Sequence, residues 1–176
     1  MGIPVPEECG VGAGIPCADE AQGVLRMRMV FENHSFATTG CAQFIDLTED
    51  VENTVAKSQV QNGMALVFSP HTTCAVLINE SESGFIRDFE DMIHALVPAD
   101  GEYRHDDMTI RTENIVPEDH EFPNGHAHLK HALIGSASQA IPVIEGELQL
   151  GQWQRVFFVE LDRARDRKVF IQVLGD

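Results

Sequence analysis

The sequence predicts an α+β fold formed by one domain. Its 176 residues are the usual size of a single domain with a hydrophobic core. Two segments carry the apolar period of a helix, and the last third of the chain is a run of short apolar segments separated by turn residues. Because closely spaced strands form hairpins, we expect an α+β arrangement and not the parallel sheet of an α/β fold.

The chain is expected to begin with an extension outside the core. Residues 1–22 are rich in Gly, Pro and small side chains and show no periodicity, so we interpret them as irregular. The folded domain is then expected to occupy residues 23–176. Its first strand is predicted over residues 24–31, where apolar alternation indicates one buried face. The alternating residues are Leu25, Met27, Met29 and Phe31.

Two helices are predicted in the first hundred residues. Thr48 is expected to cap the first, because acidic residues follow it and their charge suits the positive end of a helix dipole. Asn62-Gly63 is expected to end that helix. The second helix is predicted over residues 83–96, where apolar side chains recur at helical spacing and form a stripe.

Short apolar segments predict the remaining strands. A polar excursion over residues 98–124 separates the second helix from the last group, and loops of such length tend to be functional or irregular. The stretch 162–167 is expected to supply a turn. The remaining predicted strands are residues 41–45, 64–68, 72–78, 126–134, 140–144, 147–150, 152–161 and 168–174.

The charge balance limits the partners of the protein. With 12 basic and 28 acidic residues, the net charge of −16 argues against binding to nucleic acid or to an anionic membrane surface. No apolar run approaches the length of a membrane span, and the N-terminal residues lack the pattern of a secretory signal, so a cytoplasmic location is expected. A phosphate substrate would need local cations, for which Lys130, Arg104 and Arg155 are candidates.

Three histidines and a lysine are concentrated in residues 124–131. His126 and His128 are two residues apart, so on the predicted strand both side chains leave the same face, together with Lys130. His131 points to the other face. Neutral imidazole is a common ligand of transition metals, and catalytic Zn²⁺ sites often use three histidines with one open position. The pair therefore indicates a metal or substrate site; the alternative is two structural histidines.

A second candidate group follows the proline that interrupts the third predicted strand. That proline precedes His71, and it would bend the backbone so that the imidazole enters a cleft. Thr72 and Thr73 offer hydroxyl and backbone donors to an anion there. Asn79 and Glu80 follow the next predicted strand and are expected to orient a substrate or a ligand. The alternative is a strand bulge with a solvated histidine.

The polar excursion contains a third candidate group. Tyr103, Arg104 and His105 come directly before Asp106 and Asp107. A metal ligand at His105 would give this loop a reason to be ordered, and the carboxylates are candidates for a general base or for orienting a ligating histidine. The alternative is a charged loop that contacts only solvent.

Four segments together resemble the YjbQ family, which is catalogued as the uncharacterised family UPF0047 and is also labelled secondary thiamine-phosphate synthase. The resemblance covers roughly residues 24–174, in the family's order. The segments are Pro70-His71-Thr72-Thr73 with Asn79-Glu80, Tyr103-Arg104-His105, Gly125-His126-Ala127-His128-Leu129-Lys130, and Ser138 to Gln154, which ends in Gly-x-Trp-Gln. Departures are the extension 1–22, a longer stretch between His105 and Asn124, and Gln152 where threonine is commoner.

The resemblance implies a bifurcated, mostly antiparallel sheet curled into a pseudo-barrel with two main helices, assembled as a homotrimer. It also implies a divalent metal ion, with zinc the first expectation, held by histidines. His71, His105 and His128 match the family positions more firmly than His126. The implied activity is that of a transferase, the low-level formation of thiamine phosphate from the pyrimidine diphosphate and the thiazole phosphate.

For such an activity we expect Glu80, Lys130 and Asn79 to be catalytic, and Thr72, Thr73 and Lys130 to bind the substrate. The metal would act as a Lewis acid with a position open to water or a phosphate oxygen. Two alternatives remain open from the sequence. One is a metal-dependent hydrolase at the same histidines, and the other is a non-enzymatic metal-binding trimeric module.

Overall fold

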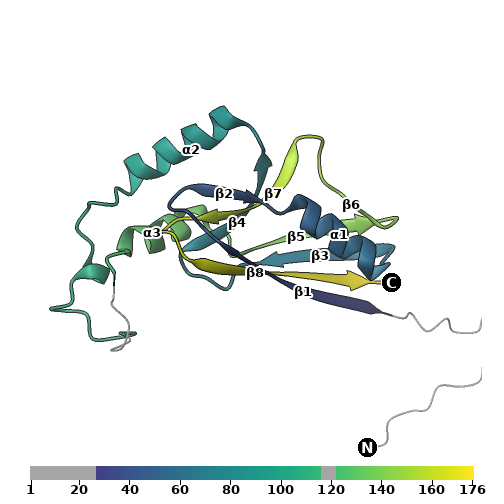
Figure 1. Cartoon of the computed structure of the whole chain (residues 1–176), viewed down its shortest axis with the longest axis horizontal. Helices are drawn as coiled ribbons and strands as arrows, with labels where there is room; N and C mark the ends of the chain where they lie inside the picture. The colour runs from purple at the N-terminus through teal and green to yellow at the C-terminus, as the bar shows by residue number, and fades with distance from the viewer. Residues whose placement is uncertain (1–26, 116–121) are drawn as a thin grey trace, which may run out of the picture.

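The structure is a computed structural model that describes residues 27–115 and 122–176. It confirms the predicted α+β class, because the described residues combine helices with antiparallel sheets (Figure 1). The predicted extension over residues 1–22 lies outside the described residues. Within the described ranges, no helix is long and apolar enough to cross a membrane.

The elements follow one another with short connections, apart from the excursion after the second helix. In chain order they are β1 (Arg28–Ala37), β2 (Gln43–Asp46), α1 (Thr48–Ser58), β3 (Asn62–Phe68), β4 (Cys74–Glu80), α2 (Ser83–Leu96), a 3-10 turn η1 (Arg104–Asp106), α3 (Gly125–Ile134), β5 (Ser138–Ile144), β6 (Glu147–Leu148), β7 (Gln154–Glu160) and β8 (Asp166–Gly175).

The strands form two antiparallel sheets, one of which curls into a half-barrel. The larger sheet has the order β1-β8-β3-β5-β6, and the smaller has the order β2-β7-β4. The main core is enclosed by strands of both sheets and by α1, whose Val51 and Val55 are buried. Phe36 of β1 packs edge-on against Phe158 of β7 at 5.0 Å between ring centroids, which ties the two sheets together.

Both ends of α1 differ from the prediction. Thr48 is the first helical residue and not the cap, because its hydroxyl accepts the N–H of Val156 at 2.9 Å. The helix ends at Ser58, followed by Gln59 in the left-handed region with φ 56°. Asn62-Gly63 does not end the helix and instead begins β3. The glycine is needed there for a close approach between strands.

The first strand runs further along the chain than predicted, and its apolar alternation faces outward. Met29 and Phe31 are 65% and 57% exposed, whereas Val30 and Phe36 point toward the interior. Neighbouring strands add apolar side chains to the same outer face, where Phe170 stacks against Phe68 at 6.3 Å. We call this surface the outer sheet face; its exposed large apolar residues are Met29, Phe31, Met64, Phe68 and Ile144.

The predicted strand over residues 126–134 is wrong, because this segment is the helix α3. Only Ile134 in this segment is β-branched, and its alanine, leucine and lysine residues favour helix. Gly135 ends the helix with φ 73°, a conformation that glycine adopts without steric cost. The Asp106 carboxylate accepts the N–H groups of Asn124 and Gly125 at 2.9 Å each, so a distant residue satisfies the start of the helix.

Gly63 gives a test of the strand packing. A Cβ at this position would overlap the carbonyl oxygen of Leu174 on β8. We expect Gly63→Ala to lower the free energy of unfolding by about 1–3 kcal/mol, since overpacking must displace a backbone strand. In the control Gly151→Ala, the new Cβ meets only the flexible side chain of Gln154, and we expect a change within about 0.5 kcal/mol. Chemical denaturation of both variants measures the difference; equal stabilities would contradict the strand register.

Candidate functional site

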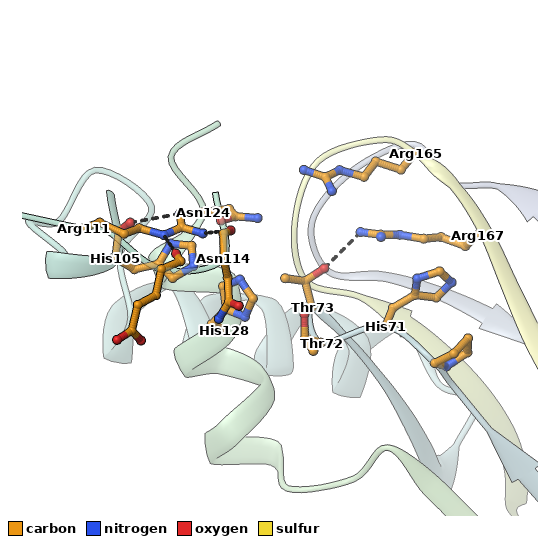
Figure 2. Close-up of a pocket in the computed structure, with 12 residues that line it drawn as sticks. His71, Thr72, Thr73, His105, Arg111, Asn114, Asn124, His128, Arg165 and Arg167 are labelled. Atoms are coloured by element: carbon orange, nitrogen blue, oxygen red, sulfur yellow. Dashed lines mark hydrogen bonds between the residues drawn. The ribbon is translucent and has the colours of Figure 1, made fainter. Parts of the chain in front are cut away.

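One pocket of about 770 Å³ collects most of the predicted site residues. It lies between the β3–β4 connection, the β7–β8 turn, the start of α3 and the excursion after α2 (Figure 2). Its volume is in the range typical of small-molecule sites. The lining residues are Pro70, His71, Thr72, Thr73, His105, Arg111, Glu113, Asn114, Asn124, His128, Arg165 and Arg167.

Figure 2 shows two groups of side chains that face each other across the pocket. We call the group on one wall the arginine side and the group on the opposite wall the histidine side. The arginine side consists of His71, Thr72, Thr73, Arg165 and Arg167. The histidine side consists of His105, Arg111, Asn114, Asn124 and His128.

Arg167 is fixed on the arginine side by a buried carboxylate. Its Nε and Nη2 atoms donate to the two oxygens of Glu160 at 2.6 and 2.8 Å, and Nη2 also donates to the Thr73 hydroxyl at 3.1 Å. Burial alone would lower the pKa of Arg167, but the hydrogen bond and charge of Glu160 outweigh it and raise the pKa. The guanidinium is therefore a permanent, oriented cation at the pocket wall.

Glu160 has more partners than its arginine. It is fully buried and also accepts the Thr38 hydroxyl at 2.9 Å and the N–H of Asp162 at 3.0 Å. The Cys74 thiol donates to it at 3.6 Å. Burial and the nearby Glu160 charge raise the pKa of Cys74 to about 12, so the thiol stays protonated at neutral pH and is not a thiolate nucleophile.

Arg165 adds a second guanidinium to the arginine side. Its Nη2 atom lies 3.1 Å from the Asp162 carboxylate. Its Nε–H is buried and has no hydrogen-bond partner among the described residues. A buried donor of this kind indicates an unoccupied position for an acceptor, such as water or an anion, beside the pocket.

His71 completes the arginine side. Its Nε2 atom accepts the backbone N–H of Lys168 at 3.1 Å, so the first residues of β8 fix the ring orientation. The ring also packs edge-on against Phe158, with 6.5 Å between centroids. Burial, and after it the positive charge of Arg167, lowers the pKa of His71, which favours the neutral ring at pH 7.

The histidine side is organised around Asp106. The His105 Nδ1 atom lies 3.2 Å from the Asp106 carboxylate that also holds the start of α3. The rings of His105 and His128 are 4.5 Å apart between centroids. Burial, followed by the charge of His105, lowers the pKa of His128. Arg111 holds the loop itself, because it donates to the carbonyls of His105, Glu113 and Asn114.

The helix separates residues that the predicted strand would have put on one face. Successive residues of a helix are about 100° apart, so His126 and His128 leave α3 on different sides. His126 is buried, its ring is 6.4 Å from that of Tyr103, and its Nδ1 has no hydrogen-bond partner among the described residues. Of the two, only His128 lines the pocket.

The three predicted catalytic residues do not line this pocket. Lys130 is fully buried, and its Nζ lies 3.4 Å from the Cys41 sulfur. It lines a separate, mainly apolar cavity of about 460 Å³, which Asn79 also lines. Glu80 is exposed at the far end of β4, where it pairs with Gln154 of β7.

The sequence reasoning missed Arg165, Arg167 and Glu160. The two arginines fall in the stretch 162–167, which the sequence predicts only as a turn. A signal was present, because two arginines separated by one residue are a local concentration of positive charge in a chain with a net charge of −16. Glu160 had no comparable signal, since nothing in an apolar strand sequence shows which charge is buried and paired.

The donor atoms of one chain do not fit the implied three-histidine metal site. Among the described residues, no group of three or more His, Cys, Asp or Glu side chains is arranged to hold a metal ion. His105 and His128 lie together, while His71 is on the opposite wall with its Nε2 already engaged. A closed or three-ligand zinc site needs more donors than this pair supplies.

Comparisons with known proteins agree on the family. The sequence profile described as "UPF0047 protein YjbQ-like" matches residues 32–176. A UPF0047 protein of Methanothermobacter thermautotrophicus is 38% identical over 78% of this chain and 87% of its own length. The UPF0047 protein YugU of Bacillus subtilis is 33% identical over 78% of this chain and 94% of its own.

Solved structures give the same result. A YbjQ-like protein of unknown function from Sulfolobus solfataricus has a TM-score of 0.73 and 31% identity, covering 86% of this chain and all of that one. An uncharacterised protein of the YjbQ/UPF0047 family from Clostridium acetobutylicum has a TM-score of 0.68 and 37% identity, covering 81% of this chain and 98% of that one. The similarity therefore extends over nearly the whole described fold.

The buried Glu160–Arg167 pair gives a test of the site's architecture. Glu160→Gln leaves Arg167 without its counter-charge in a site that is only 6% exposed, and we expect a loss of about 3–5 kcal/mol in the free energy of unfolding. The control Asp46→Asn breaks the partly exposed pair with Arg155 and should cost less than about 1 kcal/mol. Urea denaturation compares the two variants. Similar losses would mean that the buried pair does not support the fold as described.

Proposed function

The chain belongs to the UPF0047 family of YjbQ-like proteins, and from that premise we propose that it is an enzyme whose pocket binds a small phosphorylated molecule. One observation carries the proposal. Arg165 and Arg167 converge on one pocket of a strongly acidic chain, and buried Glu160 holds Arg167 in place. Guanidinium groups match the geometry of phosphate oxygens, and a protein with this net charge gains nothing from gathering them except local anion binding.

Neighbouring donors on the arginine side support the same ligand. Thr72 and Thr73 line the pocket beside the two guanidinium groups. The buried Arg165 Nε–H needs an acceptor, and a phosphate oxygen would supply one. The pocket volume of about 770 Å³ leaves room for a substrate considerably larger than phosphate alone.

The reaction that we propose for this pocket is the one implied by the family resemblance, formation of thiamine phosphate. In that reaction the bond between the pyrimidine methylene carbon and the diphosphate oxygen breaks, and the same carbon forms a bond to the thiazole nitrogen. Pyrophosphate departs with the electron pair. Fixed positive charge near the leaving oxygens lowers the barrier, and Arg165 and Arg167 would supply it. No step depends on a metal, because the donor set does not fit the implied three-histidine site.

Pyrophosphate release tests this proposal. The protein is incubated with the pyrimidine diphosphate, with and without the thiazole phosphate, and we expect release that requires both. Arg165→Gln should reduce the rate by about tenfold or more, the effect of losing a charged hydrogen bond of roughly 1.5–3 kcal/mol. Arg155→Gln, a change in an arginine that does not line the pocket, should leave the rate unchanged. Release without the thiazole phosphate would indicate a hydrolase, and no release would overturn the synthase proposal.

We also propose that the protein is a homotrimer that associates through the outer sheet face. That face exposes five large apolar side chains, among them Met29 and Phe31, and contiguous exposed apolar surface is typical of interfaces. With −16 charges on each chain, association has to overcome repulsion through apolar burial. Salt screens repulsion between copies and leaves apolar contact intact.

Light scattering in low and high salt measures this association. We expect the trimer to persist when NaCl is raised to about 1 M, because at this ionic strength charge pairs are screened within a few ångströms. Phe31→Glu should yield monomers, whereas Met108→Glu, a change at an exposed apolar residue outside this face, should not. Dissociation of the wild-type protein by salt would show that charge pairs hold the copies together and would refute the proposal.

A further inference from the structure

The three histidines that line the pocket differ in which ring nitrogens are available. The Nε2 atom of His71 accepts the N–H of Lys168 at 3.1 Å. A neutral imidazole has one acceptor nitrogen and one protonated nitrogen. Because Nε2 is the acceptor, Nδ1 carries the proton and is a hydrogen-bond donor. A metal ligand needs a free lone pair, and the His71 ring has none left to offer.

The surroundings of His71 also favour an anion over a cation. Figure 2 shows the ring beside Arg167 on the arginine side, with Thr73 close by. Arg167 carries a full positive charge and is fixed by Glu160, so it cannot turn away from an incoming metal ion. A divalent cation at His71 would meet this repulsion, whereas a phosphate oxygen would be attracted by it.

The histidine side has the opposite character. The Asp106 carboxylate 3.2 Å from His105 Nδ1 favours a proton on that nitrogen, which leaves the lone pair of Nε2 free. The ring of His128 makes no hydrogen bond to the described residues, so one of its nitrogens also has a free lone pair. The nearby carboxylates, Asp106 and Asp162, contribute negative charge here.

We infer that the pocket is divided: His71 is part of the anion site, where its Nδ1–H donates to a phosphate oxygen beside Arg167, and a divalent cation is bound by His105 and His128 without His71. The anion half rests on the proposed function. The division departs from the ligand set that the family resemblance implies, in which His71 binds the metal. A cation held by two imidazoles would take its remaining ligands from water or from the phosphate itself.

Two probes test the division separately. Inorganic phosphate and Zn²⁺ are titrated by calorimetry in separate experiments into the wild-type protein and into His71→Ala and His128→Ala. We expect His71→Ala to weaken phosphate binding by about fivefold, the value of one hydrogen bond of roughly 1 kcal/mol, and to leave zinc affinity within about twofold. We expect His128→Ala to weaken zinc binding by at least about tenfold, with phosphate affinity unchanged.

A third variant guards against a simple loss of structure. His71→Asn keeps an amide N–H that can donate to the anion, so it should bind phosphate more tightly than His71→Ala and bind zinc as the wild type does. Thermal unfolding of each variant confirms that it is folded at the titration temperature. Loss of zinc binding in a folded His71→Ala protein would overturn the inference, as would a wild-type protein that binds no zinc.

The two proposals fail in different ways. If the wild-type protein binds no phosphate, the proposed function fails and His71 loses its role in the anion site. The zinc titration of His71→Ala still decides whether His71 is a metal ligand. If phosphate binds but His71→Ala does not weaken it, the anion site stands and the assignment of His71 to it is wrong.

Discussion

The buried pair of Glu160 and Arg167 is the interaction on which the rest of the site depends. It lies where the end of β7, the start of β8 and the residues before β4 meet, and the Glu160 carboxylate also holds Thr38 after β1. Burying two charges is costly, and the cost is offset only when the remaining hydrogen bonds are satisfied. Here they are, since the carboxylate accepts from five donors among the described residues: two from Arg167, and one each from Thr38, Cys74 and Asp162. The same pair that joins the strands therefore aims a cation at the pocket.

A second carboxylate organises the opposite wall in a similar way. Asp106 accepts the first N–H groups of α3 and contacts His105, so the turn η1, the helix and the histidine ring are fixed by one side chain. Burial alone would raise the pKa of Asp106, but the hydrogen bond from Gly125 and the other donors outweigh it and lower the pKa, so the group stays ionised. Each wall of the pocket is thus built around a carboxylate that does not itself line it, and the functional groups that reach the pocket are the partners of those carboxylates.

The sequence predicted most of the fold and about half of the site. Periodicity identified α2 and the hairpin strands, because their burial patterns are local. It failed for α3, where the apolar residues do not gather on one side of the helix and two histidines at alternate positions resemble a strand face. That error placed Lys130 beside His128, whereas the helix buries Lys130 against Cys41. Residues joined to the site by long-range pairing, Glu160 above all, have no local pattern that a sequence can reveal.

The contrast between the whole chain and its pocket explains why an acidic protein can be expected to bind an anion. Charges separated by more than about 8 Å are largely screened at physiological ionic strength, so the net charge of −16 acts weakly on a ligand inside the pocket. Contacts within hydrogen-bond distance in a partly buried site are screened far less. Arg165 and Arg167 therefore decide the sign of the local field, while the acidic surface slows the approach of anions. Charge counted over a sequence excludes extended polyanions such as nucleic acid, because these contact a large surface, and it says little about a small phosphate ester that contacts two arginines.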